Sequence, residues 1–117
     1  MIFGPNSAEQ IGKTVCDLVA IKSLSGHEAP AANYVQAFLK NAGIATDRDD
    51  DDNVVAVIEP RTAANPRNNT LHLSGHTDTV VPVEGWDRDP WQPQIAGSEN
   101  ARKIVGLCTS DMKSGLA

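Results

Sequence analysis

The chain has 117 residues, which is enough for one domain with a hydrophobic core. Acidic residues outnumber basic residues by 15 to 10, and Lys and Arg form no cluster, so nucleic acid is not expected as a partner. The apolar runs end well before the roughly 18 residues that cross a bilayer, and the N-terminal sequence MIFGPNSAEQ lacks the features of a secretory signal. We therefore expect a cytoplasmic protein without a membrane partner.

Two amphipathic helices are predicted first. A capping-box pair, Ser7 and Gln10, precedes apolar residues at helical spacing, which predicts a helix over residues 8–22. A second apolar face predicts a helix over about 27–42. The residues expected at the ends of this second helix are Ser25 or Gly26 as N-cap, Pro30 in the first turn and Gly43 as the left-handed C-cap.

Strands and irregular segments are predicted for the rest of the chain. A short strand after Gly43, an acidic turn and a buried apolar strand over residues 54–58 come first, followed by a polar surface connection over residues 61–70. The further predictions are a strand at LHLSG (71–75), a long irregular segment (83–101), a strand at RKIVGLC (102–108) and a turn toward a helix at TSDMKSGLA (109–117). Mixed helices and strands indicate the α/β class.

The acidic run from Asp47 to Asn53 is similar in composition to a calcium-binding loop. Counted from Asp49, an EF-hand loop would need Gly at its sixth position and Glu at its twelfth, where this chain has Val54 and Pro60. A solvated turn between two strands is predicted instead.

His76 and Asp78 follow directly after the LHLSG segment. Residues i and i+2 of an extended chain point to the same side, so the imidazole and the carboxylate are expected to converge. A carboxylate is the usual device for orienting a metal-bound histidine, and ligands gather where strands of α/β sheets end. By itself, the pair is nevertheless more typical of a structural cap and an Asx turn. His72, inside the predicted strand, and His27, at a helix start, are interpreted as structural histidines.

Asp111 occupies a second strand-to-helix junction. It lies between the predicted strand at residues 102–108 and the helix that follows, near the positive end of the helix dipole. Alone, it is interpreted as an ordinary helix cap. The cysteines, Cys16 and Cys108, resemble neither a disulfide framework nor a thiolate zinc site, which predicts free buried thiols in a reducing compartment.

Three motifs in order carry a resemblance to a known family. SGHTDTVVP, GWDRDPW and GLCTSDMKSGLA resemble the N-terminal third of the co-catalytic zinc amidohydrolases and peptidases, which include acetylornithine deacetylase, succinyl-diaminopimelate desuccinylase, aminoacylase and glutamate carboxypeptidase. The resemblance extends over the two helices, the SLSGHE loop and the NVVAVIE strand. It implies the N-terminal part of a mixed sheet flanked by helices, with residues 1–117 forming only part of a catalytic domain.

The resemblance also implies the chemistry. His76 would be the terminal ligand of one zinc ion, Asp78 the catalytic carboxylate that orients its ring, and Asp111 the carboxylate that bridges two zinc ions, with cobalt or manganese as alternatives. The bond between Asp111 and Met112 would be cis. The implied reaction is hydrolysis of the amide bond of an N-acyl amino acid, and the complete enzyme would be a homodimer. A metallo-exopeptidase acting on short peptides, a noncatalytic binding domain and an α/β domain without metal are the alternatives.

The sequence departs from the family pattern in several places. The family has Gly-Arg-Gly where this chain has Gly106-Leu107-Cys108, and it has glycine where this chain has Ser114. The sequence ends before the family's paired glutamates, its remaining ligands and its dimerisation domain, so these 117 residues alone are expected to be inactive. The tryptophans of GWDRDPW, Trp86 and Trp91, are expected to pack against the sheet rather than to act in catalysis.

Overall fold

Two helices form the framework of the fold in the computed structural model, which describes residues 8–60, 70–98 and 101–117. Helix α1 spans Ala8–Ala20 and helix α2 spans Ala29–Asn41, which confirms both predicted helices to within two residues at each end. Helix α1 turns its apolar stripe inward, as helical periodicity requires, with Val15, Leu18 and Val19 buried. Helix α2 buries only Ala31 and Ala32, and its Phe38 is 48% exposed. Ser7, half of the predicted capping box, lies outside the described residues.

The ends of α2 agree with the sequence prediction only in part. Pro30 lies in the first turn and Gly43 has a φ of 77°, the left-handed conformation that ends a helix. The predicted N-cap is wrong, because Glu28 occupies that position and its carboxylate accepts a hydrogen bond from the backbone N–H of Gly26 at 2.8 Å. The Ser25 hydroxyl is engaged elsewhere, by a carboxylate far away in the sequence.

A hairpin follows α2. Strands β1 (Thr46–Arg48) and β2 (Val54–Ala56) pair antiparallel across the acidic run. The Asp49 carboxylate closes the turn by accepting bonds from the backbone N–H of Asp51 and from both the backbone and the side chain of Asn53, at 2.9 to 3.0 Å. The predicted solvated turn is therefore confirmed. The buried apolar strand at 54–58 is wrong, because β2 is shorter and its side chains are half-buried or exposed.

The strand predicted at residues 71–75 is also absent from the structure. This segment is extended but pairs with no other strand of the described chain, and Leu71 and Leu73 are 83% and 82% exposed. An isolated parallel bridge between Leu24 and Thr79 is the nearest pairing. Periodicity predicted extended backbone correctly here, whereas a strand also needs a neighbour that supplies its hydrogen bonds.

A second hairpin lies near the C-terminus. Strand β4 (Lys103–Val105) confirms the strand predicted at residues 102–108 only in part, since residues 106–108 form a turn. It pairs antiparallel with β3 (Gln94–Ala96), which lies in the segment predicted to be irregular. An irregular turn, η1 (Thr109–Lys113), leads into the single helical turn α3 (Ser114–Leu116). The described residues thus contain two separate two-stranded sheets rather than the predicted mixed sheet.

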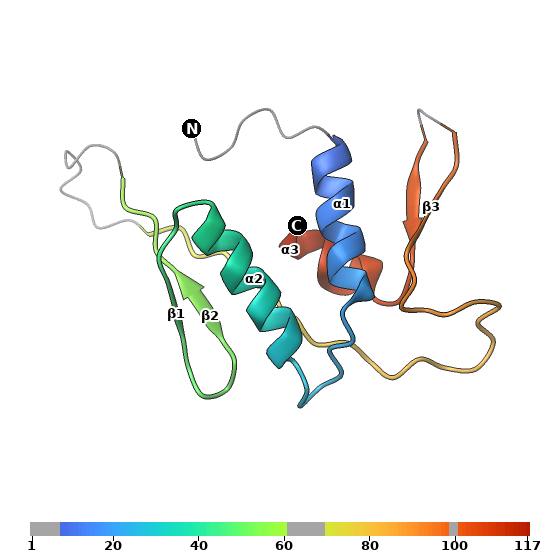
Figure 1. The fold of residues 1–117 in the computed structure, drawn as a ribbon, viewed down its shortest axis with the longest axis horizontal. Coiled ribbons are helices and arrows are strands. Elements are labelled where there is room, and N and C mark those ends of the chain that lie inside the picture. The colour runs from blue at the N-terminus through green and yellow to red at the C-terminus, as the bar shows by residue number, and fades with distance from the viewer. Residues whose placement is uncertain (1–7, 61–69, 99–100) are drawn as a thin grey trace.

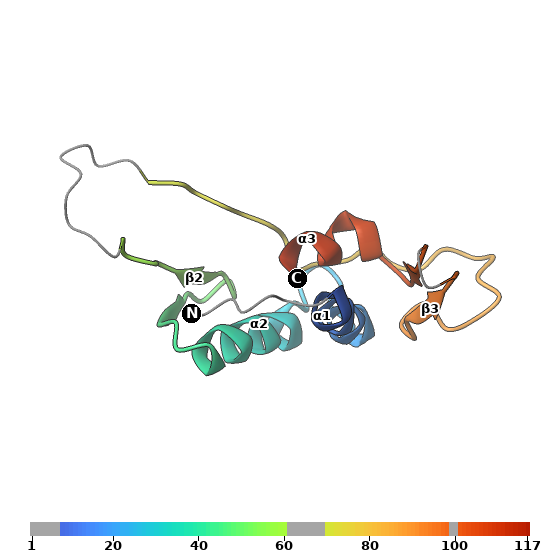
Figure 2. The same ribbon diagram turned by 90° about the horizontal axis from the view of Figure 1, so that it is seen from above.

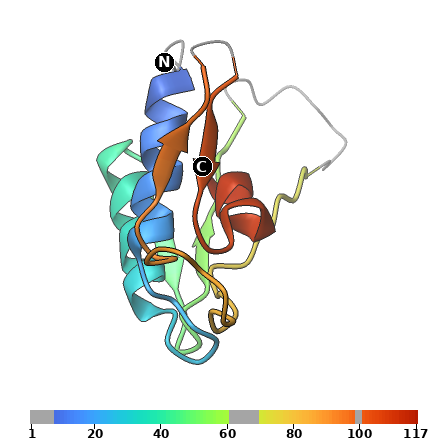
Figure 3. The same cartoon turned by 90° about the vertical axis from the view of Figure 1, so that its right-hand side faces the viewer.

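The elements nevertheless keep an α/β arrangement. Figure 1 shows α1 near the middle of the molecule, with α2 and the β1–β2 hairpin on one side and the β3–β4 hairpin on the other. Figures 2 and 3 show α1 and α2 on one face and α3 on the opposite face. Helix α1 packs against η1 and β4, and α2 packs against the first hairpin. Helix α1 is therefore the helix against which the C-terminal turn and β4 pack.

The buried core is small for the length of the chain. Its apolar members are Val15, Leu18, Val19, Ala31, Ala32, Ile44, Trp91 and Leu107. The Cα radius of gyration is 16.4 Å, compared with about 13 Å for a compact domain of this length. Both cysteines are free thiols, as predicted, but each is only half-buried. Within the described ranges, no helix is long and apolar enough to span a membrane.

Candidate metal site

Two loops bring the predicted site residues together. His76 and Asp78 lie on the extended segment that follows residue 70, and Asp111 lies in η1, more than 30 positions later. The loops pass close to each other, since the backbone N–H of His76 donates to the Met112 sulfur at 3.3 Å. A Cβ atom at Gly75 would lie 2.8 Å from the ends of the Met112 and Leu116 side chains, which would have to shift to admit a larger residue.

His76 and Asp78 converge, as their i, i+2 spacing predicts. The imidazole Nδ1 lies 3.1 Å from Asp78 Oδ1 and 3.2 Å from the Asp78 carbonyl oxygen. Both acceptors favour a proton on Nδ1, which leaves the lone pair of the neutral ring on Nε2. The contact with Asp78 thus makes Nε2, the ring nitrogen that faces away from Asp78, the nitrogen that carries the lone pair of the neutral ring.

Asp111 meets His76 on that second nitrogen. His76 Nε2 lies 2.9 Å from Asp111 Oδ1. The peptide bond from Asp111 to Met112 is cis, as the family resemblance implies, and both residues have non-helical backbone angles within η1. The side chain of Asp111 is 83% exposed, so its carboxylate is accessible to a ligand. Asp111 is therefore not the ordinary helix cap that its position in the sequence indicates by itself.

The charges at the site interact. The hydrogen bond to Asp111 is the main reason why the pKa of His76 is raised, although partial desolvation opposes it. The pKa of Asp78 is lowered, chiefly by a hydrogen bond from Ser25, with a smaller contribution from the charge of His76. The acceptors that face both ring nitrogens thus favour the protonated, imidazolium form of His76.

This donor set suits one side of a zinc site. One imidazole nitrogen and one carboxylate oxygen are donors that zinc accepts, and two ligands of a tetrahedral zinc lie about 3.4 Å apart, a little more than the 2.9 Å between His76 Nε2 and Asp111 Oδ1. Across residues 8–60, 70–98 and 101–117, however, no group of three or more His, Cys, Asp or Glu side chains is arranged to hold a metal. Asp78 lies on the Nδ1 side of the ring, so only two donors face each other.

Sequence reasoning missed the residues that support the site. Ser25 donates to Asp78 Oδ2 at 2.6 Å, although the sequence pattern assigned it to a helix cap. Lys113, which is 1% exposed, donates from Nζ to the carbonyl oxygens of Leu18 and Ile21 at 2.6 and 2.7 Å. The DMK triplet gave some signal for Lys113, because its lysine lies two residues after the candidate ligand Asp111, whereas nothing local to Ser25 indicated its distant partner.

The other aromatic and histidine residues lie outside the site. His72 is exposed and belongs to no strand, so the prediction of a satisfied strand histidine is wrong. His27 is exposed before α2, and its backbone N–H donates to the carbonyl of Leu24. Trp91 is buried, with the Lys113 ammonium 5.9 Å from its ring centre, and Trp86 is half-buried.

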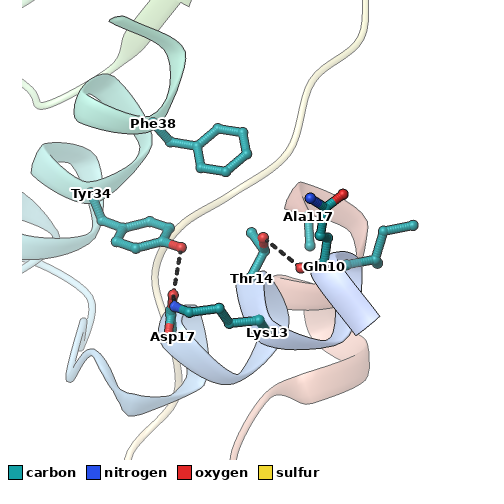
Figure 4. A pocket seen from close by; sticks show the side chains of 8 residues that line it. Gln10, Lys13, Thr14, Asp17, Tyr34, Phe38 and Ala117 are labelled. Atoms are coloured by element: carbon teal, nitrogen blue, oxygen red, sulfur yellow. Dashed lines mark hydrogen bonds and ion pairs between the residues drawn. The ribbon is translucent and has the colours of Figure 1, made fainter. Parts of the chain in front are cut away.

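A surface pocket of about 350 Å³ lies between α1 and α2, outside the candidate metal site. Figure 4 shows Tyr34 and Phe38 of α2 on one side of it and Lys13 and Asp17 of α1 on the other, with the Tyr34 hydroxyl donating to Asp17 at 3.1 Å. His76, Asp78 and Asp111 do not line this pocket. The apolar and ion-paired lining gives it no evident catalytic group.

The departures from the family pattern have distinct structural consequences. Cys108, where the family has glycine, has a φ of 53°, a left-handed conformation that L-residues other than glycine adopt at a cost. Leu107, where the family has arginine, is buried, and its backbone N–H donates to the Pro90 carbonyl at 2.8 Å. The chain therefore has a left-handed residue at position 108 that is not glycine, and it has no guanidinium at position 107.

Over most of its length, the chain is similar to proteins that are named as hydrolases. The chain is 31% identical over 105 residues to a succinyl-diaminopimelate desuccinylase from Zymomonas mobilis and 33% identical over 107 residues to one from Stenotrophomonas maltophilia, matches that cover 86% and 87% of the chain. It is 43% identical over 108 residues to a probable carboxypeptidase from Aspergillus clavatus. No family model and no solved structure matches the chain.

These similarities support a hydrolase of the peptidase and amidohydrolase family. The chain spans 22 to 26% of the length of these three relatives.

Proposed function

We propose that this chain contributes one histidine and one bridging carboxylate to the metal centre of an amide hydrolase. The observation that carries the proposal is the position of the His76 ring between two carboxylates, with Asp78 at Nδ1 and Asp111 at Nε2. A histidine whose second nitrogen is held by a carboxylate is the usual form of a metal-binding histidine. The resemblance of three ordered motifs to zinc amidohydrolases supports the same conclusion.

Each of the three residues has a distinct task in this proposal. Asp78 holds the ring tautomer with Nδ1 protonated, so that Nε2 faces Asp111. His76 and Asp111 would hold the metal, and Asp111 offers a largely exposed carboxylate that a second metal could share. Zinc, when bound, would polarise the amide carbonyl and lower the pKa of an attacking water. The general base and the remaining metal ligands would be residues other than His76, Asp78 and Asp111.

The proposed substrate is an N-acyl amino acid. Two relatives that match most of the chain are named succinyl-diaminopimelate desuccinylases, and desuccinylation removes an acyl group from an amine by hydrolysis of an amide bond. A metallo-exopeptidase acting on short peptides is the second candidate, and the similarity to a probable carboxypeptidase favours it. Both candidates use the same amide chemistry, so the site residues serve either one.

Zinc titration of the 117-residue chain, followed by NMR of its histidine ring signals, tests the metal role. Zinc should shift the His76 ring signals, and His76→Ala or Asp111→Ala should weaken zinc binding at least tenfold, because each removes one of two ligands. His72→Ala is the matched control, since that exposed histidine lies four positions away without touching either carboxylate. Equal zinc affinity in the wild type and His76→Ala would reject the metal role.

An activity screen tests the substrate class. It uses the complete product of the reading frame that contains this chain, with zinc or cobalt, against N-succinyl and N-acetyl amino acids and against dipeptides. Faster hydrolysis of the N-acyl amino acids supports the first candidate, and faster hydrolysis of dipeptides supports the second. Zinc binding without turnover of any of these substrates would favour a noncatalytic binding domain.

A further inference from the structure

The segment that follows α1 contacts both loops of the candidate site. On the first loop, the Ser23 hydroxyl donates to the Thr77 carbonyl at 2.7 Å, and the Thr79 N–H donates to the Ser23 carbonyl at 2.7 Å. Ser23 is fully buried, so these bonds are shielded from water. The backbone on either side of Asp78 is therefore fixed to the end of α1.

Lys113 fixes the second loop to the same place. Its ammonium donates to the carbonyl of Leu18, in the last turn of α1, and to that of Ile21, directly after the helix. Lys113 follows Asp111 by two residues, so this anchor holds η1 over the end of the helix. The two loops that carry His76 and Asp111 thus share one support, although the two residues are far apart in the sequence.

In the segment that follows α1, Ser25 forms a hydrogen bond to a side chain of the candidate site. Its hydroxyl donates to Asp78 Oδ2 at 2.6 Å, while the other oxygen, Oδ1, faces His76 Nδ1 at 3.1 Å. The two oxygens of one carboxylate are thus held from opposite sides, and the line of contacts runs from Ser25 through Asp78 and His76 to Asp111. Ser25 is exposed and does not cap α2, since Glu28 has that position, so the hydroxyl has no evident role in the stability of the helix.

We propose that Ser25 is a positioning residue for metal binding, because its hydroxyl holds the Asp78 carboxylate in the orientation that aligns the His76 ring. The proposal rests on the metal role proposed for His76. Without the hydroxyl, Asp78 Oδ2 is bonded to water instead, and the carboxylate is free to rotate away from Nδ1. The ring then keeps only the Asp78 carbonyl as an acceptor at Nδ1, so its tautomer and its orientation are held less firmly, which lowers the affinity of Nε2 for a metal.

The test compares two side chains of the same shape. Ser25→Thr keeps a hydroxyl at this position, and Ser25→Val replaces it with a methyl group of similar size. Zinc affinity is measured by isothermal titration calorimetry of the 117-residue chain and, in the variants that retain His76, by NMR of its ring signals, with Ser98→Ala as the control for loss of an exposed hydroxyl elsewhere. We expect Ser25→Val to weaken zinc binding about tenfold, whereas Ser25→Thr and Ser98→Ala bind zinc like the wild type.

The outcomes separate this inference from the proposed function. If Ser25→Val binds zinc as tightly as Ser25→Thr while His76→Ala does not bind it, the role of Ser25 is wrong and the metal role stands. If His76→Ala binds zinc like the wild type, the metal role fails and the role of Ser25 fails with it. Circular dichroism of each variant shows whether it folds, and Ser25→Ala replaces Ser25→Val should the bulkier side chain disturb the turn. Weaker binding by a folded variant that lacks the hydroxyl supports the proposal.

Discussion

The carboxylate of Asp78 illustrates how one residue affects a metal site without binding the metal. In the complete enzyme, we expect Asp78→Ala to lower turnover about 10- to 100-fold while zinc content falls less, because orienting groups tune a ligand rather than replace it. Steady-state kinetics and metal analysis of the purified protein provide the two measurements. His72→Ala serves as the control. Wild-type turnover in a metal-replete Asp78→Ala enzyme would reject the orienting role.

Cys108 carries a conformation that its side chain disfavours. With φ at 53°, the Cβ atom lies close to backbone atoms, a strain of roughly 1 to 2 kcal/mol that glycine avoids. We therefore expect Cys108→Gly to raise the free energy of unfolding by about 0.5 to 1 kcal/mol, after the added flexibility of the unfolded chain is taken into account. Urea denaturation measures the change.

The matched control for this prediction is Cys108→Ala, which removes the thiol but keeps the Cβ atom. It should leave the free energy of unfolding nearly unchanged, so that any gain in Cys108→Gly is due to the backbone. A glycine variant that is no more stable than the alanine variant would contradict the assignment of strain to this residue.

At the scale of elements, local sequence patterns predicted the helices, which local interactions largely determine. The helical spacing of apolar residues and the positions of Pro30 and Gly43 are local, and α1 and α2 agree with them. Strand pairing is not local: residues 71–75 have a strand-like pattern but no partner in the described chain, and β3 gains one from β4 without a strong pattern of its own. Pairing between distant segments cannot be deduced from the periodicity of either one.

The candidate site shows the same division. The spacing of His76 and Asp78 predicted their convergence, since two residues of an extended segment suffice for it. The contact between His76 and Asp111 was expected only from the family resemblance. Ser25 was misassigned to a helix cap, because serine before a helix is a common local signal and its real partner, Asp78, lies 53 positions away.

The anchor of η1 on α1 gives a prediction at the scale of elements. Lys113→Met leaves the Leu18 and Ile21 carbonyls without this donor, and we expect the free energy of unfolding to fall by about 1 to 3 kcal/mol. Methionine retains the apolar length of the stem, so the loss is specific to the ammonium group. Urea denaturation at pH 7 measures the change, and an unchanged stability would contradict the anchoring role.

Lys113 also predicts a pH dependence. Burial lowers its pKa to about 8 in the folded chain, from an ordinary value of 10.5. Between these two values the unfolded chain binds more protons than the folded chain, so this residue contributes more favourably to stability as pH rises through that window. Burial raises the pKa of Cys16 and of Tyr34, which destabilises the fold at alkaline pH. Both groups are present in the wild type and in Lys113→Met, so they do not affect the difference in stability between the two. The stability difference between wild type and Lys113→Met should therefore grow from pH 8 to pH 10.5, and a constant difference would contradict the lowered pKa.

At the scale of the whole molecule, the chain exposes much apolar surface. Large side chains that are more than 60% exposed occur on both sides of the undescribed connection: Val57, Ile58, Leu71, Leu73, Val80, Val81 and Val83, with Ile95 on β3. The principal extents of 55, 38 and 24 Å also describe an elongated shape with much surface for its mass. Exposed apolar side chains beside backbone that has no strand partner are the features that promote association between chains.

We therefore expect the 117-residue chain to self-associate through the extended segment around residue 72. Leu71 and Leu73 lie two positions apart and so share one face of that segment, and burying each leucine stabilises a contact by up to about 1.5 to 3 kcal/mol. Replacing both with lysine should raise the dissociation constant at least tenfold, as measured by sedimentation equilibrium over a range of concentrations. Ile95→Lys is the matched control, because Ile95 is also highly exposed but lies on the β3–β4 hairpin, at the opposite end of the molecule from the β1–β2 hairpin (Figure 1). If the double lysine variant associates like the wild type, or if Ile95→Lys weakens association equally, the extended segment is not the contact surface.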